Sequence, residues 1–440
     1  MALAVLPVLL AACGGGDGGP PVYSCSVSDQ KAWLADYMND WYFWYKISPR
    51  PNPAPYADVD DYFNALLYTG TDAAFPADRW SYTQSTEDFN RFFGAGQTLG
   101  YGVSVAGLEV TGQPTQPLRV RYVEALSDAA AKGVARGDQV LAINGRSAAD
   151  IIAADDYSAL SPAQAGTTLV LQLRNAGGDR SVTLTASVFT LTPVSTTTIV
   201  TSPLGRKMGY VVVKDMIKQA LAPLETAFAQ FKAAGVSEIV LDLRYNGGGL
   251  VSTGTTVASY VAGPRGSGHT YASLLYNDKQ SGSNQSYLFS SLASAAGVAR
   301  VFVLTGQRTC SASEQVINGL RGIGIDVVAI GDTSCGKPVG FLPTSQCSTT
   351  YSAVNFESVN ERFEGRYFDG FAPTCAVAED FVSPLGSPTE PLLATAREYA
   401  DLGACPAVSA ARELPQSRRS GAQRIGPTNE GDRPAGMIAR

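Results

Sequence analysis

The chain has a single histidine, His269, among its 440 residues. Serine hydrolases commonly use an imidazole to take the proton from their nucleophile. His269 follows Gly266, Ser267 and Gly268 and has no carboxylate neighbour in the sequence, so we expect a loop residue without a catalytic role. A Ser-His-Asp triad is therefore nearly excluded, and any serine chemistry in this chain needs a different base.

Other scarcities narrow the possible function classes further. The net charge is −6, from 33 basic and 39 acidic residues, so the chain lacks the basic field that nucleic-acid binding needs. No CxxC pair occurs among the cysteines, which argues against a zinc site, and we expect neither a metal nor another cofactor. After the first dozen positions no apolar run is long enough to predict a membrane-spanning helix.

The first residues have the pattern of a targeting segment. An apolar run, Leu3 to Leu10, leads to Leu-Ala-Ala-Cys ending at Cys13, which resembles the lipobox of bacterial lipoproteins. The resemblance implies a lipid on Cys13 and an exported protein anchored in a bacterial membrane, facing the periplasm at the outer membrane. An ordinary secretory signal is the alternative. A glycine-rich tether follows, so residues 1–24 are assigned to signal and tether.

Six further cysteines are candidates for disulfides in an exported chain. They are Cys25, Cys310, Cys335, Cys347, Cys375 and Cys405. Pairing of neighbours along the chain would join Cys310 to Cys335 and Cys347 to Cys375, and would leave Cys25 for Cys405. Bonds from Cys310 and Cys335 to Cys347 and Cys375 remain the alternative.

Apolar residues at helical spacing predict an N-terminal helical domain over residues 25–93. Trp33, Tyr37, Trp41 and Trp44 fall on one face, and core packing is the expected role of such an aromatic stripe.

Ser28 and Lys31 in this domain match the S-x-x-K pattern of penicillin-binding serine hydrolases. No S-D-N or K-T-G segment follows as a partner. Ser28 precedes a run with helical periodicity, so a helix N-cap explains it better. A penicillin-binding hydrolase remains a third functional alternative.

Residues 94–190 predict a separate β-domain. Short strand-like segments, a small helix at 128–134, and the strand and Asn-Gly turn of 137–145 resemble a PDZ domain. PDZ domains bind an extended C-terminal peptide by strand addition. The resemblance implies a carboxylate-binding loop formed by Leu99, Gly100, Tyr101 and Gly102. The alternative is a small β-domain without ligand binding.

Strands and helices alternate after residue 205, which predicts an α/β core with a mixed sheet and flanking helices over residues 191–410. The expected strands are 209–213, 238–243, 301–304 and 326–330, with a helix at 221–234 and another after Ser311. Residues 411–440 are rich in Arg, Pro, Gly and Ser, which predicts a disordered tail.

Three segments of this core carry candidate chemistry. A strand ends in the run Asp-Leu-Arg-Tyr-Asn-Gly-Gly-Gly over residues 242–249, where glycines let the backbone turn and expose amides. Ser311, in Ser-Ala-Ser-Glu, is expected at a helix N-terminus that favours a developing anion. Lys337 follows in Cys-Gly-Lys, and a lysine kept neutral by burial can serve as a base. The combination predicts Ser-Lys chemistry.

The order of PDZ-like segment, D-L-R-x-N-x-G-G, S-A-S-E and G-K is similar to that of the S41 serine peptidases, the C-terminal processing or tail-specific proteases, over residues 60–400. The resemblance implies Ser311 as nucleophile, Lys337 as general base, and the amides of Gly248 and Ala312 as oxyanion hole. It also implies that the substrates are proteins or peptides with free C-termini. The alternative is a PDZ scaffold or chaperone without catalysis.

One position departs from the family pattern. Many members carry a Gln four residues after the lysine, where this chain has Phe341. We expect Phe341 to desolvate the lysine, and Ser313 is a candidate partner for its amine. If the Ser311 and Lys337 segments meet, Cys310 and Cys335 should also meet, and a disulfide there would add roughly 3 kcal/mol of stability.

Overall fold

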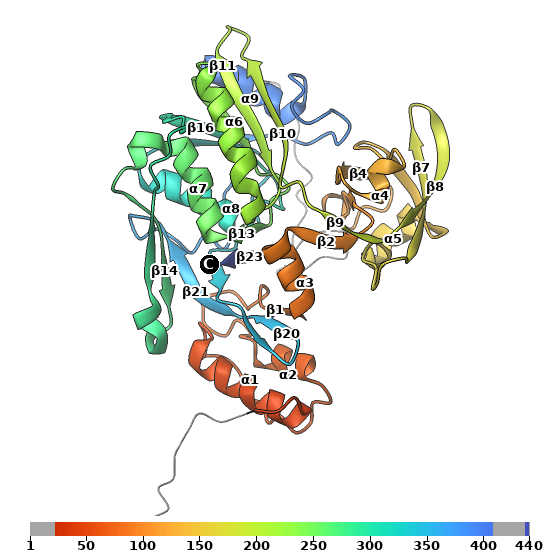
Figure 1. Cartoon of the computed structure of the whole chain (residues 1–440), viewed down its shortest axis with the longest axis vertical. Coiled ribbons are helices and arrows are strands. Elements are labelled where there is room, and N and C mark those ends of the chain that lie inside the picture. Colours follow the sequence, from red (N-terminus) through yellow and green to blue (C-terminus); the bar gives the residue numbers. More distant parts are fainter. Residues whose placement is uncertain (1–22, 408–435, 440) are drawn as a thin grey trace, which may run out of the picture.

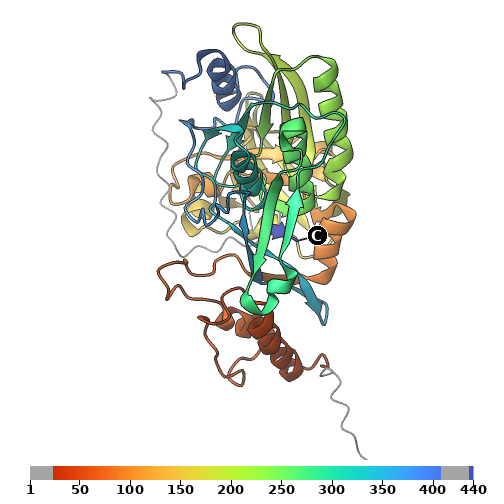
Figure 2. The same cartoon turned by 90° about the vertical axis from the view of Figure 1, so that its left-hand side faces the viewer.

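The computed structural model of this chain describes residues 23–407 and 436–439. Cys13 and all but the last two residues of the predicted signal and tether lie outside the described residues. The N-terminal helices form one end of the molecule, the α/β core forms the other, and the β-domain projects to one side (Figure 1). A view turned by 90° shows the helices again at the same end (Figure 2).

The N-terminal part is helical, as predicted. Its helices are α1 (Val27–Trp41), α2 (Val59–Leu66) and α3 (Thr86–Phe89). The cap of α1 is Ser26, whose side chain accepts a hydrogen bond from the Asp29 amide, so the predicted cap at Ser28 is two residues late. Trp33 and Tyr37 stack with ring centroids 5.4 Å apart. Trp33, Tyr37 and Trp44 pack in the core of this part, as expected, although Trp44 lies beyond the end of α1. Trp41 packs instead against the apolar cluster of the α/β core.

A three-stranded sheet ties the N-terminal part to the core. Its order is β1-β20-β19, with β1 (Tyr82–Ser85), β20 (Thr349–Ser352) and β19 (Thr344–Gln346). Residues as far as 270 positions apart therefore share one sheet, as in the pairing of Tyr82 with Ser352. The predicted boundary at residue 93 does not separate two independent packing units.

The β-domain is built on an antiparallel sheet of order β3-β4-β5-β7-β8, with β6 beside β5. The strands are β3 (Val103–Val105), β4 (Leu118–Val123), β5 (Gln139–Ile143), β6 (Arg146–Ser147), β7 (Thr168–Asn175) and β8 (Gly178–Thr185). Two helices, α4 (Asp128–Ala131) and α5 (Ala148–Ala154), pack with it. Asn144 and Gly145 both have positive φ, which suits the predicted tight turn between β5 and β6.

A two-stranded ribbon connects this domain to the rest of the chain. It pairs β2 (Gln97–Gly100) with β9 (Ser187–Thr190). Leu99 and Gly100, predicted as loop residues, belong to the strand β2, and only Tyr101 and Gly102 follow it. Pairing with β9, almost ninety residues later, converts this half of the predicted loop into a strand.

The α/β core has a six-stranded sheet of order β10-β11-β12-β16-β17-β22, parallel except for the β10 edge. Its strands are β10 (Val194–Thr201), β11 (Lys207–Val213), β12 (Glu238–Asp242), β16 (Arg300–Thr305), β17 (Asp326–Gly331) and β22 (Cys375–Ala376). The four predicted strands are confirmed within a few residues.

Helices cover both faces of this sheet. They are α6 (Leu221–Ala233), α7 (Val251–Ala262), α8 (Ala312–Gly322) and α9 (Pro391–Leu402). Ile239 and Leu241 of β12 pack in the cluster that includes α6, α7 and α8 residues, whereas Val240 packs in the cluster that includes α9. Burial on both faces explains why this strand has a continuous apolar run.

A second sheet contains a strand from the predicted disordered tail. Its order is β13-β23-β18-β21-β14-β15, with β13 (Gly248–Leu250), β23 (Gly436–Ile438), β18 (Val339–Phe341), β21 (Val354–Val359), β14 (Thr270–Tyr276) and β15 (Gln285–Leu288). For residues 436–439 the disorder prediction is wrong, because two neighbouring strands pair with β23 and bury Met437 and Ile438. The strand lies beside β13 in the middle of the molecule (Figure 1).

Three disulfides join the six cysteines of the body. The predicted bond between Cys310 and Cys335 is present. The other two preferred pairings are wrong, because Cys25 is bonded to Cys347, and Cys375 to Cys405. A contact distant in the sequence decides the first of these bonds: Cys25 precedes α1, which packs near the β19–β20 turn that carries Cys347. None of the described helices is long and apolar enough to cross a membrane.

Candidate active site

Ser311 lies in the turn between β16 and α8, at the N-cap position of the helix. Its backbone has φ 59° and ψ −113°, a conformation that costs non-glycine residues about 1–3 kcal/mol. The side chain is fully buried, and its Oγ has no hydrogen-bond partner among the described residues. A strained turn that holds an unsatisfied hydroxyl at a helix N-terminus suits a nucleophile better than a structural serine.

Lys337 is also fully buried, two residues before β18. Burial lowers the pKa of its amine to about 7, although the carboxylates of Asp78 and Glu314 act in the opposite direction. Its Nζ lies 4.0 Å from the centroid of the Phe341 ring, so this phenylalanine contacts the amine, and its desolvating role stays a prediction. A large fraction of Lys337 is therefore neutral near pH 7, as a general base requires.

Glu314 joins the nucleophile segment to the lysine segment. Its carboxylate accepts hydrogen bonds from the backbone amides of Ser311 (2.9 Å), Gly336 (2.7 Å) and Lys337 (2.8 Å), and from the Ser334 hydroxyl (2.6 Å). Burial raises the pKa of Glu314, while these hydrogen bonds act to lower it. The sequence alone indicates no role for this glutamate beyond its place as the last residue of the Ser-Ala-Ser-Glu motif.

Asn246 anchors the glycine turn against the nucleophile segment. Its Nδ2 donates to the Val213 carbonyl (3.0 Å), and its own carbonyl accepts from the Cys310 amide (3.0 Å) and the Ser313 hydroxyl (3.0 Å). Ser313, considered as a partner for the lysine amine, thus donates to the backbone of the turn. The asparagine of the D-L-R-x-N motif consequently fixes where the turn meets the serine.

The residues of the two predicted oxyanion donors, Gly248 and Ala312, lie close together. A β-carbon added to Gly248 would lie 2.9 Å from Ser311 Cβ and 3.0 Å from the Ala312 nitrogen, so only glycine fits at this position, which has φ 107°. The Gly248 amide donates to Asn246 Oδ1 (2.8 Å). That amide can bind an oxyanion only after it leaves the Asn246 side chain, and the pair Gly248 and Ala312 stays a prediction.

The remaining motif residues are structural. Arg244 makes a two-point contact to Glu390 (2.7 and 3.0 Å) and a hydrogen bond to Asp242 (3.0 Å), all buried. Glu390 also caps α9 by accepting from the Leu393 amide. The D-L-R part of the motif therefore clamps the end of β12 to the start of α9.

The structure does not bring the competing candidates together. Ser28 is exposed and contacts the Ser26 hydroxyl, whereas the Lys31 amine donates to the carbonyls of Pro53 and Tyr56 (2.8 Å each). His269 does have a carboxylate neighbour, because its Nδ1 lies 2.8 Å from Glu361, 92 residues later in the chain. This corrects the expectation from sequence neighbours alone.

Two sulfurs and a carboxylate lie close enough together to be candidate ligands of one metal ion; they belong to Cys310, Cys335 and Glu314. Their geometry would suit a metal if the sulfurs were thiolates. The two sulfurs are bonded to each other, so they offer no thiolate ligand.

We predict that loss of the Cys310–Cys335 bond reduces both stability and turnover. The bond joins the residue before Ser311 to the segment of Lys337, with Cα atoms 5.1 Å apart. The Cys310→Ser/Cys335→Ser double variant should lose about 3 kcal/mol of unfolding free energy and about 10- to 100-fold in kcat, because small misplacements of catalytic groups are costly. Denaturant unfolding and steady-state kinetics measure the two effects.

The Cys375–Cys405 bond offers a matched control. It closes a loop of similar length, 30 residues against 25, but it joins β22 to the segment after α9. The Cys375→Ser/Cys405→Ser variant should lose a similar free energy and keep its kcat. An equal loss of kcat in both variants would contradict a positioning role for the Cys310–Cys335 bond.

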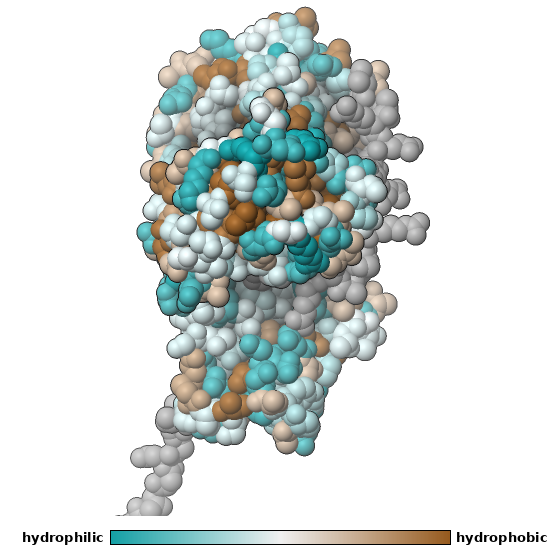
Figure 3. All heavy atoms as spheres, turned by 90° about the vertical axis from the view of Figure 1, so that its right-hand side faces the viewer, coloured by the Kyte–Doolittle hydropathy of each residue, from teal (hydrophilic) through white to brown (hydrophobic). Residues whose placement is uncertain are grey.

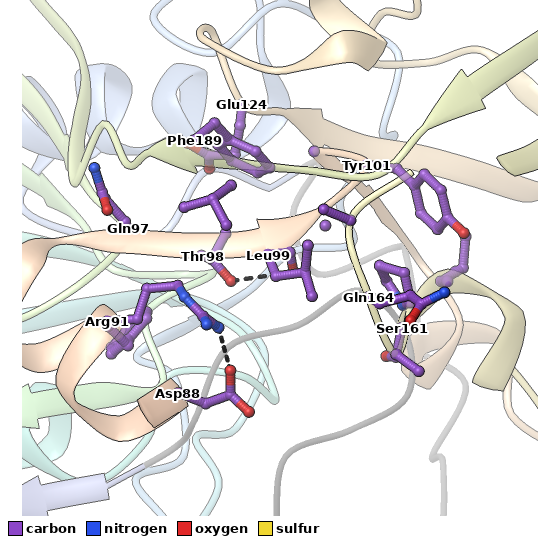
Figure 4. A pocket seen from close by; sticks show the side chains of 18 of the residues that line it. Asp88, Arg91, Gln97, Thr98, Leu99, Tyr101, Glu124, Ser161, Gln164 and Phe189 are labelled. Carbon is purple, nitrogen blue, oxygen red and sulfur yellow. Dashed lines mark hydrogen bonds and ion pairs between the residues drawn. The ribbon is translucent and has the colours of Figure 1, made fainter. Parts of the chain in front are cut away.

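A cavity of about 770 Å³ lies between the β-domain and the N-terminal part. All four residues of the predicted peptide-binding segment line it, and Leu99, Tyr101, Gln164 and Phe189 surround it in Figure 4. Figure 3 shows the face of the molecule that carries the β-domain, where apolar side chains gather between hydrophilic ones. The cavity combines apolar side chains such as Leu99 and Phe189 with polar ones such as Arg91 and Gln164, and residues of β2 and β9 line it, a mixture that suits an extended peptide.

Comparisons with known proteins agree with this architecture. Residues 207–361 match the sequence model of Peptidase family S41, and residues 29–82 match that of the Peptidase S41 N-terminal domain. A carboxyl-terminal-processing protease from Synechocystis sp. is 28% identical over 222 residues, which cover 50% of this chain and 49% of that protein. Carboxyl-terminal-processing peptidase 3 of Arabidopsis thaliana is 32% identical over 164 residues, covering 34% and 31%.

A crystal structure of a protein from Bacteroides fragilis, described as an S41 protease, has the same fold. It superposes with a TM-score of 0.66 at 24% identity and covers 87% of this chain and 99% of that chain. The matches thus show that two segments of this chain are similar to the S41 peptidase models and that the curated relatives are carboxyl-terminal-processing proteases, and the solved structure shows a shared fold. The chain spans about half the length of the curated relatives that it matches most extensively.

Proposed function

We propose that this chain is a serine endopeptidase that cleaves proteins by a Ser-Lys mechanism and recognises their C-terminal tails through its PDZ-like β-domain. The observation that carries the proposal is the burial of Lys337, which lowers the pKa of its amine to about 7. Glu314 and the Cys310–Cys335 disulfide join the segment of Lys337 to the segment of Ser311. The names of the relatives, carboxyl-terminal-processing proteases, support the same substrate class.

The mechanism starts with neutral Lys337, which takes the proton from Ser311 Oγ as this oxygen attacks the scissile carbonyl. The amides of Gly248 and Ala312 stabilise the oxyanion, and loss of one such donor typically costs about 100- to 1,000-fold in rate. The ammonium then protonates the leaving amine, which departs and leaves an ester on Ser311. Lys337, neutral again, takes a proton from water, and the resulting attack releases the acid and regenerates the serine.

Tail recognition is assigned to the cavity at Leu99 to Gly102. Backbone amides after β2 would hold the terminal carboxylate, and the apolar wall formed by Leu99 and Phe189 would hold the last side chains. The lipid anchor at Cys13 and a periplasmic location belong to the same proposal, and they rest on the Leu-Ala-Ala-Cys sequence alone.

The direct test uses two peptide substrates that differ only at the C-terminus, one with a free carboxylate and one with an amide. The free acid should have a lower KM, because only the carboxylate is recognised by the loop amides. Equal KM values for the two peptides would contradict tail recognition, and absence of cleavage in both would contradict the peptidase assignment.

A charge placed in the cavity should weaken this recognition. Leu99→Glu puts a charge into the wall that would hold the last side chains, next to the amides that would hold the substrate carboxylate. We therefore predict an increase of at least about tenfold in KM for the free acid, equivalent to about 1.4 kcal/mol. The kcat value should change little, since Ser311 and Lys337 are untouched.

Leu204→Glu is the matched control, because Leu204 is 80% exposed in the β10–β11 turn and outside the cavity. The same substitution there should leave both constants near those of the parent protein. A comparable rise in KM for the two variants would show that the added charge acts nonspecifically.

A further inference from the structure

Residues 436–439 lie between the glycine turn and the lysine segment. β23 pairs in parallel with β13, with Gly436 opposite Gly248, and in parallel with β18, with Ile438 opposite Phe341. The Gly436 amide donates to the Gly247 carbonyl (3.1 Å), and the Ala439 amide donates to the Phe341 carbonyl (3.0 Å). Backbone pairing on both sides is how an extended peptide is held by strand addition.

The Gly436 carbonyl lies next to the proposed reaction centre. A β-carbon added to Gly248 would lie 2.9 Å from Ser311 Cβ and 3.0 Å from the Ala312 nitrogen. The same position is 2.4 Å from the Gly436 carbonyl oxygen. A β-carbon on Gly436 itself would lie 3.3 Å from the Phe341 ring, the ring that covers the Lys337 amine. The carbonyl group of Gly436 therefore lies close to both Ser311 and the Ala312 amide.

The side chains of the tail fix its register. Met437 is fully buried, its sulfur accepts a hydrogen bond from Gln315 of α8 (3.3 Å), and it belongs to the apolar cluster of Ala312. Ile438 is fully buried in the other direction, in the cluster that contains Leu250 and Phe341. Alternate burial of successive side chains is the pattern of a strand bound in a two-sided groove.

We propose that Gly436–Ala439 is a tethered inhibitor of this chain's own active site, bound as a substrate strand would be. The proposal rests on the proposed function, and it adds a regulation of that site and a preference for glycine beside Ser311 followed by two apolar residues. It explains why Ser311 and Lys337 are both completely buried, although a peptidase must admit a polypeptide. A substrate binds only when the tail leaves.

The expected effect follows from the tether. A segment linked to its own site acts at an effective concentration on the order of 1 mM. With an intrinsic dissociation constant of about 50 μM, such a segment would leave about one site in twenty open. Truncation after Ala435 should therefore raise kcat/KM for a peptide substrate about 20-fold.

The key measurement adds the peptide acetyl-Ala-Gly-Met-Ile-Ala-Arg, which has the sequence of residues 435–440, to the truncated protein. A tethered inhibitor predicts competitive inhibition. A purely structural strand predicts the opposite sign, since the peptide would restore folding and raise activity. Restored activity, or no effect at concentrations up to the millimolar range, overturns the proposal.

Two further measurements keep the proposal testable if the truncated chain misfolds or if the protein has no catalytic activity. Met437→Asp in the full-length chain should activate as truncation does, and Met437→Leu should activate less, which keeps the test valid if the truncated chain unfolds. Binding of the labelled peptide to Ser311→Ala protein requires no chemistry: the truncated form should bind it and the full-length form should exclude it. Equal binding to both forms overturns the proposal, whereas absence of cleavage in every form refutes only the proposed function.

Discussion

Ser311→Ala is expected to lower kcat/KM by on the order of 10⁴-fold or more, because no other group in the site can form the acyl-enzyme. Folding should remain intact or become slightly more stable. The Ser311 Oγ is buried without a hydrogen-bond partner among the described residues, so its removal takes away an unsatisfied polar group and no bond. Peptide cleavage and thermal unfolding, measured on the same preparation, check both parts.

Ser313→Ala is the appropriate control, because it removes the second serine of the same motif. The Ser313 hydroxyl donates to the Asn246 carbonyl, so its loss should slightly loosen the glycine turn and leave activity at least about 100-fold above that of Ser311→Ala. Full activity in Ser311→Ala, or equal inactivity of both variants, would contradict the assignment of the nucleophile.

Lys337→Met is expected to abolish cleavage and to stabilise the fold at neutral pH. The parent amine has a pKa near 7 in the folded state and an ordinary value of 10.5, so the unfolded chain binds more protons between these values. Stability of the parent protein therefore rises with pH across this window, with a slope that approaches about 1.4 kcal/mol per pH unit. Methionine has no proton to exchange, so the difference in unfolding free energy between Lys337→Met and the parent protein should shrink as the pH rises from 7 to 10. Urea unfolding of both proteins at several pH values measures this difference.

Lys214→Met provides the contrast. Lys214 is also buried, and its amine forms an ion pair with Glu124, so its loss leaves a buried carboxylate and should destabilise the fold by about 3 kcal/mol. Destabilisation by Lys337→Met of similar size would contradict the stabilisation expected from the lowered pKa of Lys337.

The pH dependence of kcat/KM should also follow the titration of the Lys337 amine. Because only the neutral amine can accept the serine proton, kcat/KM should rise with pH through about 7 and reach a plateau above it. Lys337→Arg should be inactive throughout, since a guanidinium does not give up its proton in this range.

The parts of the site that lie in continuous motifs could be predicted from the sequence. Ser311 follows a buried strand and opens a helix, and the Asp-Leu-Arg-Tyr-Asn-Gly-Gly-Gly run ends another strand. Parallel strands bring their carboxyl ends to one edge of a sheet, so these motifs meet for topological reasons. The pairing of Cys310 with Cys335 follows from the same meeting.

Contacts set by tertiary packing could not be predicted in this way. Glu314 binds three amides that belong to two segments, and Asp78 acts on Lys337 from the N-terminal part. Neither role leaves a local pattern. The strand Gly436–Ile438 could not be predicted from the composition of residues 411–440, because three residues hardly change that composition. These three residues form a strand because β13 and β18 pair with them.

The most direct test of the account is to map the residue that a serine-directed acylating probe modifies, by mass spectrometry of the digested protein. We predict modification of Ser311 alone, faster in the chain truncated after Ala435 and absent in Lys337→Met. Modification of Ser28 would instead support a penicillin-binding type of hydrolase, and no modification in either form would support a scaffold without catalysis. Either of these two results would contradict a Ser311–Lys337 peptidase.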